Sequence, residues 1–322
     1  MVHRTSSRGE TVDVRLISLV VAGILVLVLS FLTMAVGVYR GSKAENYEEG
    51  GLAGGTEASE ILDESAEELE TGGLTTEISR VDFQPVIDAW TSNLGGTKSV
   101  LIYDLEREEV AGSYNIGQTY NTASLYKLFV VYEGYRRVSD GRWDGAETVR
   151  GTGKTTLECL DLAIRESHSP CAEGLWAMVG QAELDRIISE EYRILNSRIS
   201  GLSSNVSDVA AIMRRFYEHP EIAGETEIAR MFDSFLNQPA TTYNWRQGLP
   251  SGFSGQVKVY NKVGWDWNGK SWNVYHDAAI VEFPVEKRHF IVVVMTSRVP
   301  YSAIKSLGAQ IEATFREQNA AQ

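Results

Sequence analysis

Hydrophobic and polar residues divide the chain into three stretches of different character. The first, residues 16–39, reads LISLVVAGILVLVLSFLTMAVGVY and contains no charged side chain. At about 1.5 Å per residue, a helix of this length crosses a hydrocarbon core of about 30 Å. We therefore expect a single transmembrane anchor here, preceded by a cytoplasmic segment at residues 1–15. A cleaved signal peptide is the rival interpretation, although its apolar region usually spans only about 7–15 residues.

The second stretch, residues 40–80, is rich in Gly, Ser, Thr and Glu and has few large apolar side chains. Acidic sequence of this kind repels itself and cannot bury a core, so we expect a flexible linker. The basic residues that flank the apolar stretch favour only slightly an N-terminus on the cytoplasmic side. This topology would place the remainder of the chain outside the cytoplasm.

The third stretch, residues 81–322, has the pattern of a folded domain. Apolar residues at helical spacing predict a helix at 81–90 that stops before Gly95 and Gly96, and two strands follow within 99–113 around a turn at 106–109. Further helices are predicted at 125–137, 157–165, 171–179, 182–191, 206–217 and 225–236. Three strands at 256–262, 274–283 and 290–296 and an amphipathic helix at 301–317 complete the pattern.

This order of elements predicts an α/β fold of the α+β sandwich type. One antiparallel sheet would be built from both ends of the domain, with helices inserted between its strands and packed on both faces. The formal net charge of -13 argues against a nucleic-acid partner, because phosphates need concentrated Lys and Arg. The His and Cys residues lack the spacing of a metal site, so we expect neither a metal nor another cofactor.

The segment Thr122-Ala-Ser124-Leu-Tyr-Lys127 carries the first candidate chemistry. It places a serine at the start of an apolar helix and a lysine three residues later, so both side chains project from one side of the first turn. A serine hydroxyl becomes a nucleophile when a neighbouring base accepts its proton, and a lysine can do so when burial lowers its pKa. An S-x-x-K pattern alone arises by chance roughly once in a few hundred residues.

Two later motifs strengthen this interpretation. Ser167-His168-Ser169 lies between two predicted helices, and Lys262-Val263-Gly264-Trp265 begins on the last residue of the predicted strand 256–262. With the S-x-x-K segment they stand in the order S-x-x-K, S-D-N, K-T-G of penicillin-binding proteins and β-lactamases. The Arg246–Pro250 stretch and His276-Asp277 also fit. Over roughly residues 81–317 the chain resembles the class A β-lactamase-like family of serine hydrolases, with its penicillin-recognising β-lactamase/transpeptidase-like fold.

The resemblance implies a role for each matching residue. Ser124 would be acylated and Lys127 would take its proton. Ser167 would relay a proton to the leaving group, and Lys262 would supply positive charge. The backbone N–H groups of Ser124 and Trp265 would form the oxyanion hole. Gly264 would let the strand come close to the ligand. His168 and Ser169 of the second motif would be the other substrate-contacting positions.

The chain departs from the family pattern in three places. His168-Ser169 replaces the Asp-Asn of the second motif, and Val263 replaces the Thr of the third, which removes groups that contact the substrate. The E-x-x-L-N loop that carries the deacylating glutamate of class A enzymes has only Glu190 and Glu191 as candidates, at the wrong spacing. We interpret both as surface residues at a helix end, and expect slow hydrolysis of the acyl-enzyme.

Several other residues keep two interpretations open. Cys159 and Cys171 flank the second motif, and outside the cytoplasm a disulfide between them is favoured over two buried thiols. His168 is either a second general base or an exposed loop residue. The Trp residues before and within the third motif suit stacking on a sugar or peptide, or belong to the core: these are Trp245, Trp265, Trp267 and Trp272.

The sequence thus favours a membrane-anchored serine hydrolase whose catalytic domain lies outside the cytoplasm. We expect its substrate to be a β-lactam or a peptidoglycan-derived D-alanyl peptide, its membrane contact to be the N-terminal helix, and its soluble domain to be monomeric. The alternative is a weakly active or inactive module, penicillin-binding, carboxypeptidase-like or cell-wall-sensing. An esterase or transpeptidase that uses the same Ser–Lys pair is the third interpretation.

Overall fold

The structure, a computed structural model, describes residues 78–238, 245–267 and 272–320. They belong to a compact unit that spans Gly73–Gln322. The expected anchor at 16–39, the segment before it and nearly all of the expected linker lie outside the described residues. Within the described ranges, no helix is both long enough and apolar enough to cross a membrane.

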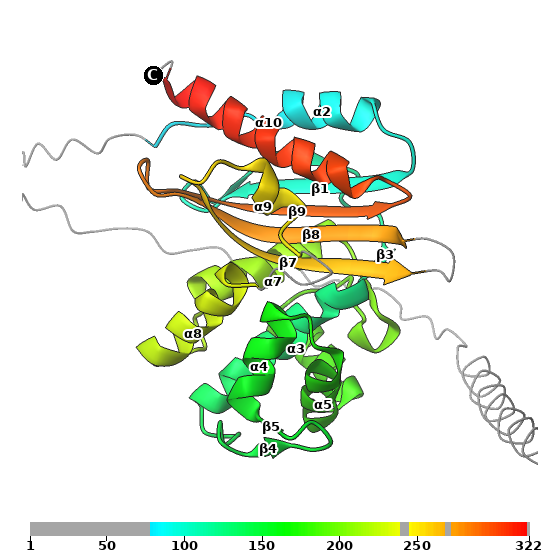
Figure 1. Ribbon diagram of the computed structural model, residues 1–322, viewed down its shortest axis with the longest axis vertical. Helices are drawn as coiled ribbons and strands as arrows, with labels where there is room; N and C mark the ends of the chain where they lie inside the picture. The colour runs from blue at the N-terminus through cyan, green and yellow to red at the C-terminus, as the bar shows by residue number, and fades with distance from the viewer. Residues whose placement is uncertain (1–77, 239–244, 268–271, 321–322) are drawn as a thin grey trace, which may run out of the picture. The chain divides into compact units, whose positions relative to one another are not determined.

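A five-stranded antiparallel sheet forms the centre of this unit, and its strands come from both ends of the chain (Figure 1). The strand order is β2-β1-β9-β8-β7. The central strand, β9, reads RHFIVVVMTS and is buried along most of its length, which is why its apolar run is nearly continuous. The bounds are Thr97–Asp104 for β1, Glu109–Tyr114 for β2, Lys258–Trp267 for β7, Trp272–Phe283 for β8 and Arg288–Ser297 for β9.

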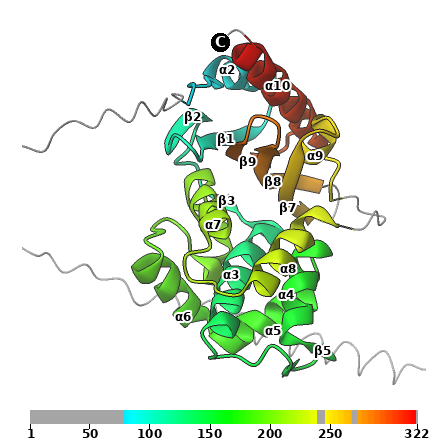
Figure 2. The ribbon, with the colours of Figure 1, turned by 90° about the vertical axis from the view of Figure 1, so that its left-hand side faces the viewer.

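Helices cover both faces of the sheet (Figures 1 and 2). One face carries α2 (Gln84–Ser92), α9 (Leu249–Gly252) and α10 (Tyr301–Ala320). The aromatic side chains of that layer pack closely, with the Phe283 and Phe315 rings stacked at 3.8 Å. Beneath the other face lie α3 (Tyr126–Ser139), α4 (Thr156–Arg165), α5 (Ser169–Val179), α6 (Gln181–Arg186), α7 (Val206–Glu218) and α8 (Glu225–Leu236). The expected layered arrangement is therefore confirmed.

Polar residues fix the starts of several helices in the lower layer. Thr155 and Glu158 form a reciprocal capping box at the start of α4. Asn205 caps α7 by accepting the Asp208 N–H at 2.9 Å. These caps explain why both helices start within one residue of the expected positions.

The short elements are the ones that the hydrophobic pattern does not reveal. They are the strand pairs β3 (Tyr120–Asn121) with β6 (Ser203–Ser204) and β4 (Thr148–Val149) with β5 (Lys154–Thr155), and the turns η1 (Ala123–Leu125), η2 (Ile187–Glu191) and η3 (Ile199–Gly201). One expectation is wrong in detail, because Ser124 lies in the 3₁₀ turn η1 and the α-helix begins only at Tyr126. The expected helix at 182–191 is likewise shorter, since α6 gives way to the π-turn η2 after Arg186.

Candidate active site

Hydrogen bonds of Asn121 with Ala123 and His276 support the turn that carries Ser124. The Asn121 side-chain Oδ1 accepts the Ala123 N–H at 2.8 Å, and the Asn121 carbonyl oxygen lies 2.8 Å from His276 Nε2. Ala123 adopts a positive φ of 44°, a conformation that costs energy in a residue other than glycine. The backbone strain at Ala123, directly before the serine, is therefore maintained by these hydrogen bonds.

His276 is a buried imidazole in a defined tautomer. Its Nδ1 accepts the Thr296 backbone N–H at 3.0 Å, so the proton is on Nε2 and is donated to the Asn121 carbonyl. Burial lowers the pKa of His276 to about 4, although its bonds to the backbone oppose this shift. The ring is consequently neutral at ordinary pH, as both of its bonds require.

Gly264 brings strand β7 against the serine turn. A Cβ atom at this position would lie 2.7 Å from the Thr122 carbonyl oxygen and 3.0 Å from Leu125 Cγ. The strand can approach so closely only because position 264 has no side chain. Gly264 pairs with His276 on the neighbouring strand, so β7 and β8 together support the turn.

Lys127 projects from the first turn of α3 into a buried environment. Burial lowers its pKa to about 8, and the negative charge of Glu173 opposes this effect. The amino group donates to the carbonyl oxygen of Ser167, to Ser167 Oγ at 3.2 Å and to Ser169 Oγ at 3.1 Å. Among the hydrogen bonds of the described residues, none joins Lys127 to Ser124. The lysine is thus held by the loop of the second motif.

Ser167 links the two lysines of the site. Lys262 donates to Ser167 Oγ at 2.9 Å and to the Val263 carbonyl oxygen at 2.8 Å. The Ser167 hydroxyl oxygen therefore accepts a hydrogen bond from the amino group of each lysine. Burial lowers the pKa of Lys262 well below its usual value, and the nearby Lys127 charge acts in the same direction. Ser167 has a positive φ of 53°. The backbone of Ser167 is therefore strained, and its hydroxyl lies between two buried amines, where it is well placed to pass a proton.

Behind Lys262 lies a buried polar group, Asp277. It accepts the Asn261 side-chain N–H and the Leu249 backbone N–H, both at 2.9 Å. Burial raises the pKa of Asp277 to about 7, against the effect of these two bonds. The carboxyl group supports strand β7 from the side remote from Ser167.

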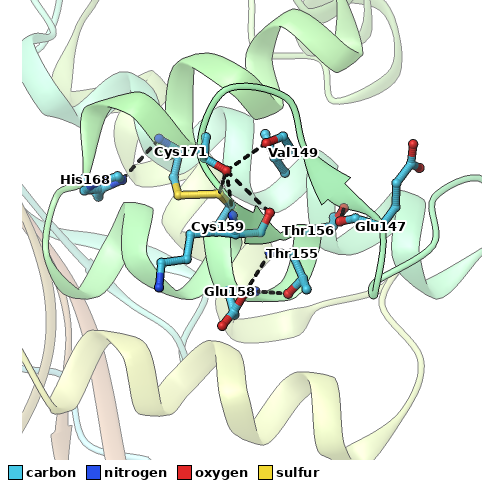
Figure 3. Close-up of a disulfide and its surroundings, with 10 residues drawn as sticks. Glu147, Val149, Thr155, Thr156, Glu158, Cys159, His168 and Cys171 are labelled. Atoms are coloured by element: carbon cyan, nitrogen blue, oxygen red, sulfur yellow. Dashed lines mark hydrogen bonds between the residues drawn. A yellow bond between two sulfur atoms is a disulfide. The ribbon is translucent and has the colours of Figure 1, made fainter.

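The loop that presents Ser167 is held by a disulfide and by a helix cap at His168, both of which Figure 3 shows. A disulfide joins Cys159 on α4 to Cys171 on α5, which agrees with the expected pairing and excludes two free thiols. His168 caps α5, because its Nδ1 accepts the Cys171 N–H at 3.2 Å. The ring nitrogen nearer the backbone is therefore engaged in the cap.

The chain also matches a known family in its sequence. The sequence of residues 82–315 matches the β-lactamase enzyme family. The chain belongs to this family. None of the curated proteins compared is similar in sequence to it.

Solved structures show the fold of this β-lactamase-family chain. A β-lactamase from Xanthomonas campestris pv. campestris is 14% identical with a TM-score of 0.64, over 73% of this chain and 99% of that one. An ancestral class A β-lactamase is 15% identical with a TM-score of 0.62, over 72% and 100%. The protein PBP-A is 20% identical with a TM-score of 0.62, over 76% and 97%. At these identities the likeness establishes the fold alone.

Glu190 and Glu191 lie away from the lysines in this family member. Glu190 pairs with Arg186 at 3.1 Å, and Glu191 pairs with Arg186 and with Arg136 at 2.9 and 2.7 Å. The Glu190 side chain is 65% exposed. Both glutamates are surface residues at the end of a helix, as the spacing indicates.

The aromatic residues near the third motif have a packing role. The Trp265 ring contacts Trp245 at 4.9 Å, Tyr301 at 4.8 Å and Tyr275 at 5.8 Å. Trp265 and Trp245 are half-buried within this cluster. The side chains of Trp267 and Trp272, the other two tryptophans near the third motif, are not among those described.

The structure brings Lys127, Ser167, Ser169 and Lys262 into direct hydrogen-bond contact, and it places Ser124 on the turn beneath Gly264. Sequence reasoning included His276 in a motif but missed its role, because hydrogen bonds to main-chain groups leave no pattern in the sequence. It also missed Glu173, whose charge acts on Lys127. No group of three His, Cys, Asp or Glu side chains that could hold a metal ion occurs in the described part of the chain.

Proposed function

We propose that this chain is a serine acyl-transfer enzyme that is acylated at Ser124 by β-lactams or by D-alanyl peptides. The observation that carries the proposal is a pair of hydrogen bonds beside the serine turn. Ser167 Oγ accepts one from Lys127 Nζ at 3.2 Å and one from Lys262 Nζ at 2.9 Å. A nucleophile, a base of lowered pKa and a hydroxyl relay are the parts that acyl transfer at neutral pH requires. Membership of the β-lactamase enzyme family supports this reading.

Acylation would proceed in two proton transfers. Neutral Lys127 accepts the Ser124 proton as Ser124 Oγ attacks the substrate carbonyl carbon. The proton then passes by way of Ser167 to the leaving nitrogen as its bond to carbon breaks. Lys262, at the far side of Ser167, would supply positive charge when an anionic group of the substrate lies beside it, because that charge opposes the effect of burial on the pKa of Lys262. The backbone N–H groups of Ser124 and Trp265 would receive the oxyanion.

Lys127 must shift its hydrogen bonds for this step. In the free enzyme its amino group donates to Ser167 and Ser169, which holds it beside the turn. Such contacts often tighten or change only when substrate binds. A pKa of about 8 leaves a useful fraction of the amine neutral at neutral pH. The base is therefore available without a large rearrangement of the fold.

The second half-reaction would be slow. Glu190 and Glu191, the candidates for the loop glutamate of class A enzymes, are bound to arginines on the surface. Ser169 and Val263 also offer fewer substrate contacts than the amide and hydroxyl they replace. The acyl-enzyme would persist, which is the behaviour of a penicillin-binding protein more than of an efficient β-lactamase. We further propose that residues 16–39 anchor the enzyme with its catalytic domain outside the cytoplasm.

A labelling experiment tests this function. The purified chain is incubated with a fluorescent penicillin and analysed by intact mass, with Ser124→Ala as the control. Stoichiometric labelling that depends on Ser124 and persists for many minutes is the expected result. Absence of labelling in the wild-type chain would refute acylation by β-lactams. Fast, sustained turnover of a chromogenic cephalosporin would refute slow hydrolysis.

A further inference from the structure

One face of helix α5 runs along the start of α3. Ser169, Glu173 and Trp176 are spaced at i, i+4 and i+7, so their side chains leave α5 on the same side. The Ser169 hydroxyl lies 3.1 Å from Lys127 Nζ, and the Trp176 ring lies 5.3 Å from the Tyr126 ring. Glu173 stands between these two contacts. Its side chain therefore starts out alongside Tyr126 and Lys127.

The Glu173 carboxylate is exposed to solvent. In the described ranges it takes part in none of the hydrogen bonds or ion pairs, whereas Glu190 and Glu191 are both bound to Arg186. Its negative charge nevertheless raises the pKa of Lys127 and that of Tyr126, which agrees with a position beside them. Glu173 is thus a solvent-exposed carboxylate next to the lysine of the site, and none of the hydrogen bonds or ion pairs of the described residues engages it.

We propose that Glu173 is the general base for hydrolysis of the Ser124 acyl-enzyme, an inference that rests on the proposed function. The carboxylate takes a proton from a water molecule as the water oxygen bonds to the acyl carbonyl carbon. The resulting oxyanion collapses and the bond between that carbon and Ser124 Oγ breaks. The proton passes from Glu173 to the serine oxygen. The ester and the water become a carboxylic acid and a free serine, and the glutamate regains its charge.

The exposure of Glu173 sets the size of its contribution. Well-oriented general bases accelerate a step by about 10²–10⁴-fold. Glu173 is not oriented by hydrogen bonds and competes with bulk water, so we expect an effect of about tenfold, below that range. This agrees with an acyl-enzyme that is long-lived but not permanent. The contribution is confined to deacylation, because Lys127 already serves as base in the first step.

The test separates the two half-reactions in the full chain. Each variant is acylated with a fluorescent penicillin, excess label is removed, and loss of label from Ser124 is followed with time. Glu173→Gln should slow this loss about tenfold without slowing acylation, because removal of a charge that raises the pKa of Lys127 increases the neutral fraction of that base. Glu190→Gln, which removes the same charge elsewhere, should change neither rate. Undiminished acylation also shows that the Glu173 variant is folded.

Two further readouts distinguish a base from a residue that merely shapes the site. Added formate should restore part of the deacylation rate in Glu173→Ala, and it should leave the deacylation rate of the wild-type chain unchanged. An unchanged label lifetime in Glu173→Gln overturns this inference while the proposed function stands. Absence of Ser124 labelling in the wild-type chain overturns both.

Discussion

Replacing Gly264 by alanine is the sharpest single perturbation of the serine turn. The new Cβ would lie 2.7 Å from the Thr122 carbonyl oxygen and 3.2 Å from the Leu125 N–H nitrogen, both of them backbone atoms. Bringing the first contact to 3.4 Å, where ordinary van der Waals contact begins, requires strand β7 and the turn to separate by about 0.7 Å. Backbone atoms cannot yield as the end of a flexible side chain can.

The expected loss follows from this displacement. A misplacement of about 1 Å at a reacting centre can cost on the order of 10²-fold in rate, so we expect acylation of Ser124 to fall about 10–100-fold. Overpacking of this kind also costs about 1–3 kcal/mol of stability. For a unit of this size that lowers the melting temperature by roughly 2–12 °C. The effect on rate should therefore exceed the effect on the folded population at 25 °C.

Stopped-flow acylation with a fluorescent penicillin measures the rate, and a thermal melt measures stability. Gly255→Ala is the matched control, because a Cβ at position 255 would meet no atom within 4 Å. It should change neither quantity appreciably. If the Gly264→Ala chain acylates within threefold of wild type, β7 does not need close contact with the serine turn, and the reasoning fails.

Three other predictions concern the base, the disulfide and the buried imidazole. The acylation rate at low substrate should rise with pH up to about 8 and then level off, because Lys127 acts as the neutral amine; a flat pH profile or an active Lys127→Met variant would contradict this. Reduction of the Cys159–Cys171 disulfide, which closes a separation of 12 residues, should lower the free energy of unfolding by about 3 kcal/mol in urea titrations. His276 has a folded-state pKa of about 4, below its value of about 6.5 in the unfolded chain, so the unfolded state binds the proton first as pH falls. The free energy of unfolding should therefore decrease by up to about 3 kcal/mol between pH 6.5 and 4, and it should decrease less in His276→Gln. A difference in free energy of unfolding between the two chains that does not change with pH would contradict this prediction.

The long elements of the fold could be predicted because their sequence pattern is strong. Strand β9, with its Val-Val-Val run, is buried along most of its length, and helix α8 buries one surface with apolar residues at helical spacing. The two-residue strands could not be predicted, because a pair such as Asn121 with Ser203 is imposed by the surrounding structure. Such short pairings leave no periodicity to detect.

The residue types of the candidate site could also be predicted, but not its contacts. The motifs identified Ser124, Lys127, Ser167 and Lys262 by order along the chain. The positive φ at Ala123 and at Ser167, and the attachment of Lys127 to the second motif, depend on packing between elements far apart in sequence. Glu173 escaped notice because a lone exposed glutamate on a helix resembles any solvent-facing residue until its neighbours are known.

The pairing of β1 with β9 joins residues between 186 and 200 positions apart in the chain. Such distant contacts form late in folding, and loop closure slows them. During synthesis, the serine and its helix emerge well before Lys262 and the central strand of the sheet. The β1–β2 hairpin meanwhile has an open edge that invites association with other chains. The candidate site, which needs Lys262 beside Ser167, is consequently incomplete until the last strands have joined the sheet.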